Sequence, residues 1–335
     1  MSTRVTIKDI AKAYGCSVNC VSRALMDAPD ISESTKEKIK QLAAEMGYVY
    51  NRNAATLRVG KSRTVGILFD SLLNPFYFIM TNYIWGRLDR EGYSIVTLKN
   101  NTLSFGEDVV RQMISNNVDG LLSFLQPTEA ACREIENNSL PTVVIGRKTH
   151  GMCDCIYLDD VAGGALAAKY FIERGYRKPM YLGETDSLEC SLERGTGFKS
   201  EFDKIGITPR MVYGVPDRDN KFAAYFKELV ESGEAPDCVF CFSDLVAYEV
   251  MSVLDKNNLT DIEVVGYDDI QKEISLPGAL KSIAYDKKAM AESAVSLLLE
   301  KINGGVKTKR RETVISDFKL DGVTSDRKKI NKRRY

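Results

Sequence analysis

The chain has 335 residues, the length of two or three ordinary domains. With 44% hydrophobic and 27% charged residues, its composition excludes a collagenous, low-complexity or largely disordered protein. It contains no run of about 18 apolar residues and no signal-peptide-like start, so we expect a cytoplasmic protein without a membrane span. His150 is the only histidine, which leaves little material for a histidine-based triad or a multi-histidine metal site.

The charge is unevenly distributed, although the formal net charge is zero. Residues 1–61 carry +4, residues 327–335 carry +6, and residues 62–326 carry −10. A basic head on an acidic body indicates that only the head approaches a polyanion, although a merely solvated surface explains the charges equally well. We expect the basic tail, 327–335, to be disordered.

The eight cysteines are expected to be free thiols, because a cytoplasmic chain of this length needs no disulfides. Cys238 and Cys241 form a C-x-x-C inside an apolar run that is typical of a buried strand. Neither this pair nor the C-x-C of Cys153 and Cys155 has a second pair or a histidine at zinc-site spacing. The sequence therefore predicts no metal and no cofactor.

Capping residues and glycines divide the first fifty residues into three predicted helices. A capping-box-like pattern, T-x-x-D, begins at Thr6. Gly15 suits the left-handed backbone of a tight turn, and Ser17 can cap the helix that follows. The helices are expected over 6–13, over 17–24, and from Ser32 to a stop at Gly47. Two short helices joined by a glycine-containing turn predict a helix-turn-helix.

The second helix of this head is expected to face outward with side chains suited to DNA. Asparagine can pair with adenine and arginine with guanine in the major groove, and valine can meet a thymine methyl group. Short polar side chains suit phosphate oxygens. The residues of the head predicted to contact DNA are Thr6, Ser17, Val18, Asn19, Ser22, Arg23 and Asn51. A solvated helix face, or a three-helix protein-binding module, is the alternative interpretation.

Five motifs in this region occur in a specific order and spacing. They are VTIKDIA at 5–11, GCS at 15–17, VSRAL at 21–25, GYVYN at 47–51 and AATLRVGK at 54–61. Together they resemble the head of the lactose/galactose-repressor family of bacterial transcription regulators, and the resemblance continues to about residue 325. Cys20 departs from the family, which usually has threonine there. Val18 and Asn19 fall at variable, specificity-setting positions, so the resemblance does not supply an operator sequence.

The resemblance identifies residues 50–61 as a hinge. In the family this segment folds into a helix only on DNA, where it pairs with the hinge of the dimer mate in the minor groove. Leu57 matches the family's wedge residue, which opens a base step and kinks the duplex. Ala54 matches a small residue that lets the hinges approach closely, and Arg58 suits a narrow groove. Without the resemblance, Leu57 is an ordinary apolar linker residue.

Strand-like and helix-like segments alternate through residues 62–326. Strands are expected over 64–70, 93–99, 119–124, 142–146, 156–159, 180–183, 211–215, 238–242, 264–268 and 282–285. Helices are expected over 75–91, 106–117 and 162–175, with Trp85 in the core. Near-continuous apolar strands between helices predict parallel sheets covered on both faces.

More than 260 residues fit two lobes around one cleft better than they fit a single sheet. The segment resembles the family's periplasmic-binding-protein-like core, in which the chain crosses between the lobes three times. The crossings are expected near 160, 287 and 317. The predicted domains are a head at 1–49, a hinge at 50–61, a first lobe at about 62–159 and 288–316, a second lobe at about 160–287 and 317–326, and the tail.

Ligands of parallel sheets bind at the carboxyl ends of the strands. Asp70, Asp159 and Ser243 end or follow predicted strands. Phe76 lies in an N-P-F-Y turn, Arg194 in an E-R-x-x-G-F motif and Asp268 in G-Y-D-D, and the resemblance assigns such motifs to the effector pocket. The predicted effector-binding residues are Asp70, Phe76, Asp159, Arg194, Ser243 and Asp268. Carboxylates accept hydrogen bonds from sugar hydroxyls, arginine donates a fork, and an aromatic ring covers the apolar sugar face. Each carboxylate is alternatively a helix cap or part of a salt bridge between lobes.

These features predict a repressor that binds a near-palindromic operator as a homodimer and is controlled by a small molecule, expected to be a sugar. The alternative is a cytoplasmic sugar sensor without DNA function. An enzyme is disfavoured, because no nucleophile, base and orienting group can be assembled. The tail has no heptad repeat, which favours a dimer over a tetramer. The effector, its direction of action, the operator, the regulated genes and any protein corepressor stay open.

Overall fold

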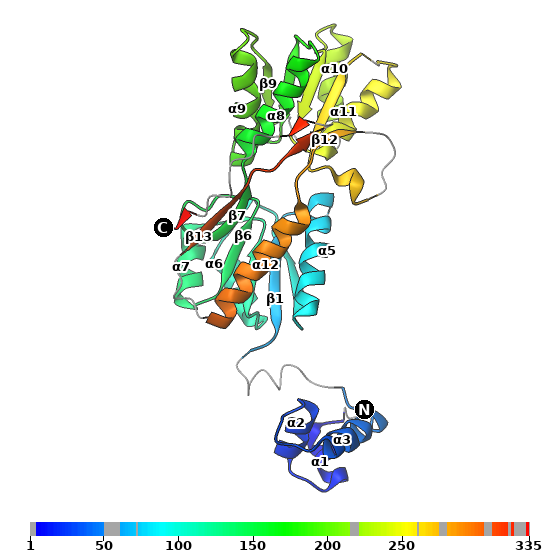
Figure 1. The fold of residues 1–335 in the computed structure, drawn as a ribbon, viewed down its shortest axis with the longest axis vertical. Coiled ribbons are helices and arrows are strands. Elements are labelled where there is room, and N and C mark those ends of the chain that lie inside the picture. The colour runs from blue at the N-terminus through cyan, green and yellow to red at the C-terminus, as the bar shows by residue number, and fades with distance from the viewer. Residues whose placement is uncertain are drawn as a thin grey trace. The chain divides into compact units, whose positions relative to one another are not determined.

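A computed structural model of the protein describes residues 5–49, 61–71, 73–214, 221–259, 261–274, 280–304, 310–320, 323–324 and 333–334. The chain forms two compact units, Met1–Ser62 and Arg63–Tyr335 (Figure 1). We call them the head and the core and describe each by itself. No helix in the described ranges is both long and apolar enough to span a bilayer.

Three short helices make up the described part of the head, as the sequence predicts. They are α1 (Ile7–Tyr14), α2 (Val18–Leu25) and α3 (Glu33–Glu45). The Thr6 backbone N–H and hydroxyl both donate to the Asp9 carboxylate, at 2.8 and 2.7 Å, which fixes the start of α1. Gly15 ends α1 with φ 79°, a conformation that glycine adopts without strain. Ser17 caps α2 by accepting a 3.1 Å hydrogen bond from the Cys20 N–H.

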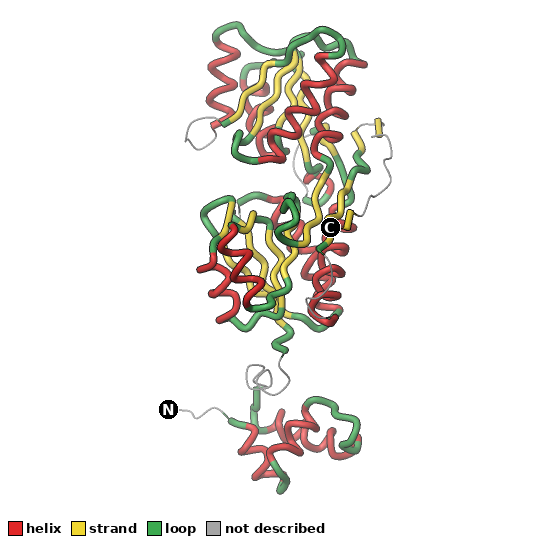
Figure 2. Tube along the Cα trace, turned by 90° about the vertical axis from the view of Figure 1, so that its left-hand side faces the viewer, coloured by secondary structure: helices red, strands yellow, loops and turns green. Residues whose placement is uncertain are grey.

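The core contains two parallel sheets with helices on both faces of each, and Figure 2 shows this layering. The first sheet, which defines the N-lobe, has the order β16-β13-β7-β6-β4-β1-β2. Its strands are β1 (Thr64–Phe69), β2 (Ser94–Lys99), β4 (Gly120–Ser123), β6 (Thr142–Ile145), β7 (Asp154–Leu158), β13 (Arg311–Ile315) and β16 (Arg333–Arg334). All neighbours pair in parallel except β13 with β16, which are antiparallel.

The second sheet defines the C-lobe and has the order β12-β11-β10-β8-β9. Its strands are β8 (Pro179–Gly183), β9 (Arg210–Tyr213), β10 (Cys238–Cys241), β11 (Glu263–Tyr267) and β12 (Lys281–Ile283). Two small sheets accompany these lobes. They pair β3 (Ser104–Phe105) with β5 (Gln126–Pro127), and β14 (Lys319–Leu320) with β15 (Val323–Thr324).

Helices cover the lobes as Figure 1 labels them. Those of the N-lobe are α5 (Pro75–Arg90), α6 (Glu107–Ser115), α7 (Glu129–Asn137) and α12 (Lys287–Gly304). Those of the C-lobe are α8 (Asp160–Glu173), α9 (Glu189–Asp203), α10 (Lys221–Glu231), α11 (Asp244–Lys256) and the 3-10 helix η1 (Ile270–Lys272). Up to β14 the chain passes between the lobes after β7, after β12 and after β13, which confirms the predicted two-lobed fold with three crossings, and β16 lies again in the N-lobe sheet.

Trp85 is a correction to the predicted core, because its side chain is 55% exposed. Residues 77, 80, 84 and 88 form the buried stripe of α5 at helical spacing. Phe78 and Trp85, seven residues apart, share a side of the helix next to this stripe and face solvent. The position of Trp85 in the helical repeat, and not its apolar character, determines that its side chain is exposed.

Two other predictions concern the thiols and the tail. All eight cysteines are free, and Cys153, Cys155, Cys238 and Cys241 are buried as expected. Most of the tail, 327–335, lies outside the described residues. Within it, Arg333–Arg334 pair with β13 as an edge strand, and the disorder of the tail stays a prediction.

Candidate functional site

The first site is the exposed side of α2 in the head. Asn19 and Arg23 are exposed, and Val18 is half-buried. The Arg23 guanidinium pairs with Asp30 at 2.5 Å, an exposed contact that a stronger partner can replace. The Thr6 and Ser17 hydroxyls already serve the helix caps described above. The head therefore presents one amide and one guanidinium at successive turns of a short helix.

Ser22 is a correction, because its side chain is only 7% exposed and does not face outward as predicted. Positions 18, 22 and 25 of a helix share one stripe. Val18 and Leu25 of this stripe pack against the core of the head, and Ser22 lies between them. Four predicted DNA contacts lie outside the described residues, namely Asn51, Ala54, Leu57 and Arg58.

The second site is a cavity of about 350 Å³ between the two lobes. The carboxyl ends of strands from both sheets face it, as expected for parallel sheets. The structure brings five of the six predicted effector residues to its wall, namely Asp70, Phe76, Arg194, Ser243 and Asp268. We call this cavity the first chamber.

Asp159 is the exception and does not line the chamber. Its carboxylate accepts a 3.0 Å hydrogen bond from the Ala162 N–H and so caps α8, which was the alternative interpretation. The next residue, Asp160, is buried in the first turn of the helix and reaches Arg194. Strand β7 ends at Leu158, one residue earlier than predicted, which moves the inward position from Asp159 to Asp160.

The Arg194 side chain is only 6% exposed, and its charge is compensated inside the protein. Its Nε donates to the Asp160 carboxylate at 2.7 Å, and its Nη1 donates to the Phe242 carbonyl at 2.6 Å. The guanidinium also lies over the Tyr267 ring, 3.5 Å from its centre. Burial raises the pKa of Asp160 to about 6, and Arg194 opposes that rise. Burial alone would lower the pKa of Arg194, but Asp160 holds it well above its ordinary value, so the guanidinium stays charged.

Glycines place Arg194 beside Asp160 by allowing α8 and α9 to touch. A Cβ atom on Gly164 would lie 1.9 Å from the Arg194 carbonyl oxygen, and one on Gly197 would lie 2.0 Å from that of Val161. Both obstacles are backbone atoms, which cannot move aside as a flexible side chain can. The two glycines are therefore part of the site, since they set the helix spacing that positions the arginine.

Asp268 lies in a strained turn directly after β11. Its φ is 99°, and that of Asp269 is 49°, a region that residues other than glycine rarely adopt. The Tyr285 hydroxyl donates to the Asp268 carboxylate at 2.9 Å, and the Lys287 ammonium donates to its carbonyl oxygen. Such strain persists where surrounding contacts fix the conformation, as these do.

Asp244 supports the same turn from behind and is itself 1% exposed. Its carboxylate accepts hydrogen bonds from the Ile270 N–H at 2.7 Å and from the Ser282 hydroxyl at 2.6 Å. Burial, with a contribution from the charge of Asp268, raises the pKa of Asp244 to about 7 against the two hydrogen bonds, which lower it. The turn therefore contains a carboxyl group that titrates near neutral pH.

This group predicts a pH-dependent stability of the core. Between pH 4 and 7 the folded chain holds a proton on Asp244 that the unfolded chain has released, so the free energy of unfolding falls as pH rises. We expect wild type to lose roughly 2 kcal/mol relative to Asp244→Asn between pH 5 and 8. Urea unfolding of both proteins at the two pH values measures the difference. Asp255→Asn, an exposed change on the same helix, should follow wild type, and an identical pH profile for Asp244→Asn would contradict the prediction.

Sequence reasoning missed three charged groups of the first chamber, Arg147, Glu184 and Glu249. Arg147 follows β6 as Asp70 follows β1, so the strand-end rule applied to Asp70 could have found it. Its Nε donates to the Phe124 carbonyl at 2.6 Å, and its guanidinium also interacts with the Tyr77 hydroxyl. One carboxylate oxygen of Asp70 is buried and unpaired among the described residues. Such an atom is a candidate contact for a bound polar molecule.

Two family descriptions match the chain. Residues 6–51 match "Bacterial regulatory proteins, lacI family", and residues 168–320 match "Periplasmic binding protein-like domain". The repressor PurR of Vibrio atlanticus is 29% identical over 308 residues, which cover 89% of this chain and 92% of the relative. The regulator MalR of Clostridium butyricum is 27% identical over 314 residues, covering 89% and 93%.

Solved structures share the fold over nearly the whole length. The lac repressor dimer bound to operator and the anti-inducer ONPF has a TM-score of 0.81 at 21% identity, covering 96% of this chain and 99% of that one. The complex of the regulator CelR with cellobiose has a TM-score of 0.65 at 22% identity, with the same coverage.

Proposed function

This chain belongs to the lacI family of bacterial regulatory proteins, and we propose that it binds an operator as a homodimer under the control of a small molecule in the first chamber. As a member of this family it is a DNA-binding transcriptional repressor with an effector-binding core, not an enzyme. The observation that carries the proposal is the presence, in one chain, of an exposed Asn19 and Arg23 on α2 and a polar chamber between two lobes.

We assign base recognition to Asn19, Arg23 and Val18 on α2, because amide and guanidinium groups read base edges in the major groove. Thr6 and Ser17 lie at helix N-termini, where hydroxyl and N–H groups suit phosphate oxygens. The family resemblance extends these contacts to a minor-groove hinge formed by Asn51, Ala54, Leu57 and Arg58. Two heads related by dimer symmetry require half-sites about one helical turn apart, ~34 Å, or a multiple of it.

The basic head predicts steep salt dependence of operator binding. If six or more phosphates are neutralised, the affinity should fall on the order of 10³-fold between 50 and 200 mM salt. An operator selected in vitro from random duplexes and followed by fluorescence anisotropy provides the measurement. An operator affinity that does not change with salt concentration would contradict phosphate binding by the head.

A neutral polyhydroxylated effector fits the first chamber best. Asp70 and Asp268 can accept hydrogen bonds from neighbouring hydroxyls, and the Phe76 ring can cover an apolar sugar face. Asp160 already neutralises Arg194, so four carboxylates outnumber the remaining cation, Arg147, and these are Asp70, Glu184, Glu249 and Asp268. This excess of carboxylates disfavours phosphorylated or acidic ligands. Relatives named PurR and a CelR–cellobiose complex make purines and sugars the classes to compare.

A thermal-shift screen of the full-length chain tests the effector class. Neutral sugars are expected to raise the melting temperature, whereas purine bases and sugar phosphates are not. Because coupling between sites is reciprocal, a stabilising sugar must also change operator affinity, and the operator must change sugar affinity by the same factor. Stabilisation by a purine alone would replace the sugar assignment while leaving the repressor function intact.

We assign the dimer contact in the N-lobe to the exposed face of α5. Phe78 and Trp85 are 65% and 55% exposed on one side of this helix. Grouped apolar side chains of this size on a surface mark an interaction site. An isologous contact between two copies would bury them.

A further inference from the structure

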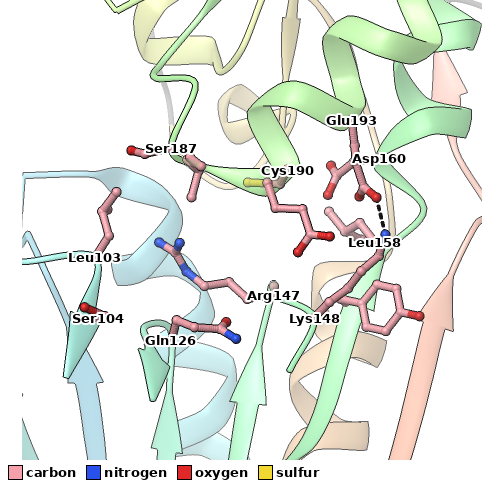
Figure 3. Close-up of a pocket in the computed structure, with 14 residues that line it drawn as sticks. Leu103, Ser104, Gln126, Arg147, Lys148, Leu158, Asp160, Ser187, Cys190 and Glu193 are labelled. Atoms are coloured by element: carbon pink, nitrogen blue, oxygen red, sulfur yellow. Dashed lines mark hydrogen bonds and ion pairs between the residues drawn. The ribbon is translucent and has the colours of Figure 1, made fainter. Parts of the chain in front are cut away.

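A second chamber of about 440 Å³ adjoins the first. Six residues line both cavities, namely Leu103, Gly146, Arg147, Leu158, Leu188 and Cys190. In Figure 3, Arg147 extends between Leu103 of the N-lobe and Ser187 of the C-lobe. The two chambers therefore share a wall at Arg147 and lie along the same cleft between the lobes.

The formal charges of the second chamber are largely paired within the protein. Lys148 of the N-lobe forms an ion pair with Glu193 of the C-lobe, drawn as a dashed line in Figure 3. Asp160 pairs with Arg194, and Glu189 lies 3.2 Å from the His150 ring, a contact that is an ion pair only when the imidazole is protonated. A ligand that approaches Lys148, Glu193 or Asp160 with a charge would compete with these internal pairs, whereas a neutral ligand leaves them intact.

Uncharged polar groups complete the lining of the second chamber. Gln126, Ser104 and Ser187 contribute an amide and two hydroxyls. The Gln126 side chain makes no hydrogen bond to any residue in the described ranges, so its amide can both donate to and accept from a ligand. Leu103, Leu158 and Leu188 supply apolar surface beside these groups. Apolar walls with a few placed amide and hydroxyl groups suit a sugar ring.

We propose that the second chamber binds the second ring of a neutral glycoside, which makes the effector a disaccharide rather than a monosaccharide. This inference rests on the proposed function and narrows its ligand class. Asp70, Arg194 and Asp268 hold one ring in the first chamber, and Gln126 and the neighbouring hydroxyls hold the other. Arg147 lines both chambers, where its guanidinium can donate to oxygens of both rings.

The dimensions agree with one ligand divided between two chambers. Volumes of about 350 and 440 Å³ both lie at the small end of the usual range for ligand pockets, about 300–1,000 Å³. The six shared lining residues place the two chambers next to each other, as one ligand that occupies both requires. A single linked ligand also avoids the second association cost that two separate monosaccharides would incur.

Calorimetric titration of the full-length protein tests the proposal. The probes are cellobiose, maltose and lactose, compared with glucose and galactose. We expect one disaccharide to bind at least about tenfold more tightly than either of its component sugars. Gln126→Trp, which fills the second chamber, should reduce that disaccharide to the affinity of a monosaccharide and leave monosaccharide binding within about twofold. Gln112→Trp, the same change at an exposed position of α6 in the same lobe, should alter neither.

The possible outcomes separate this inference from the proposed function. Equal affinities for disaccharides and monosaccharides, an unaffected disaccharide in Gln126→Trp, or two monosaccharides bound per protomer would each overturn the second-ring assignment alone. Binding of no saccharide would overturn both this inference and the sugar class of the proposed effector. Unchanged monosaccharide binding by Gln126→Trp also shows that the variant is folded.

Discussion

Replacing Trp85 with arginine should convert the dimer into a monomer. In an isologous contact the same side chain occurs twice, so the change removes two large aromatic surfaces and brings two like charges together. The indole faces solvent within the protomer and makes no part of its core, so each protomer should remain folded. Sedimentation velocity at micromolar concentration measures the change in mass.

Operator binding by Trp85→Arg should weaken by about 10²- to 10⁴-fold. A dimer delivers its second head at a high effective concentration once the first is bound, and a monomer loses that advantage. Ile205→Arg, which places the same charge at an exposed apolar position in the C-lobe, is the matched control and should remain dimeric. A dimeric Trp85→Arg protein with unchanged operator affinity would move the interface away from α5.

Local signals predicted the head well, because its helices are short and each is bounded by a recognisable residue. The Thr6–Asp9 start, the Gly15 turn and the Ser17 cap all depend on contacts within four residues, and a sequence pattern contains that information. Ser22 shows where such signals end. Its burial depends on how α2 packs against the other two helices, which no local pattern specifies.

The strand-end rule located most of the first chamber, because parallel strands deliver their carboxyl ends to one edge whatever their order in the sheet. It failed at Asp159 and Asp160, where a shift of one residue decides between a helix cap and a buried ion pair. The same rule could have predicted Arg147, which follows β6. The rule could not have predicted the second chamber, because the lining of this chamber combines Gln126 of a two-residue strand with Lys148 and Glu193 from opposite lobes.

Arg194→Met should destabilise the core by about 3–5 kcal/mol, because it leaves the Asp160 carboxylate buried without its cation. It should also abolish effector binding, since the guanidinium lines the first chamber. Urea unfolding measures the first effect, and titration with the stabilising sugar measures the second. Arg210→Met removes one side of an exposed 2.9 Å ion pair with Glu234 and should cost less than about 1 kcal/mol.

The double variant Arg194→Met with Asp160→Leu separates stability from recognition. Replacing both partners of a buried pair by apolar side chains removes the unpaired charge, so we expect most of the lost stability to return while effector binding stays absent. The loss of stability in the single variant Arg194→Met should also be smaller at pH 5 than at pH 8. Without the guanidinium the pKa of Asp160 must rise further above about 6, so the carboxyl takes up a proton at low pH and the buried charge disappears. An Arg194→Met defect that is the same at pH 5 and pH 8, or that the second substitution does not relieve, would show that the arginine stabilises the core through its packing on Tyr267 and not through Asp160.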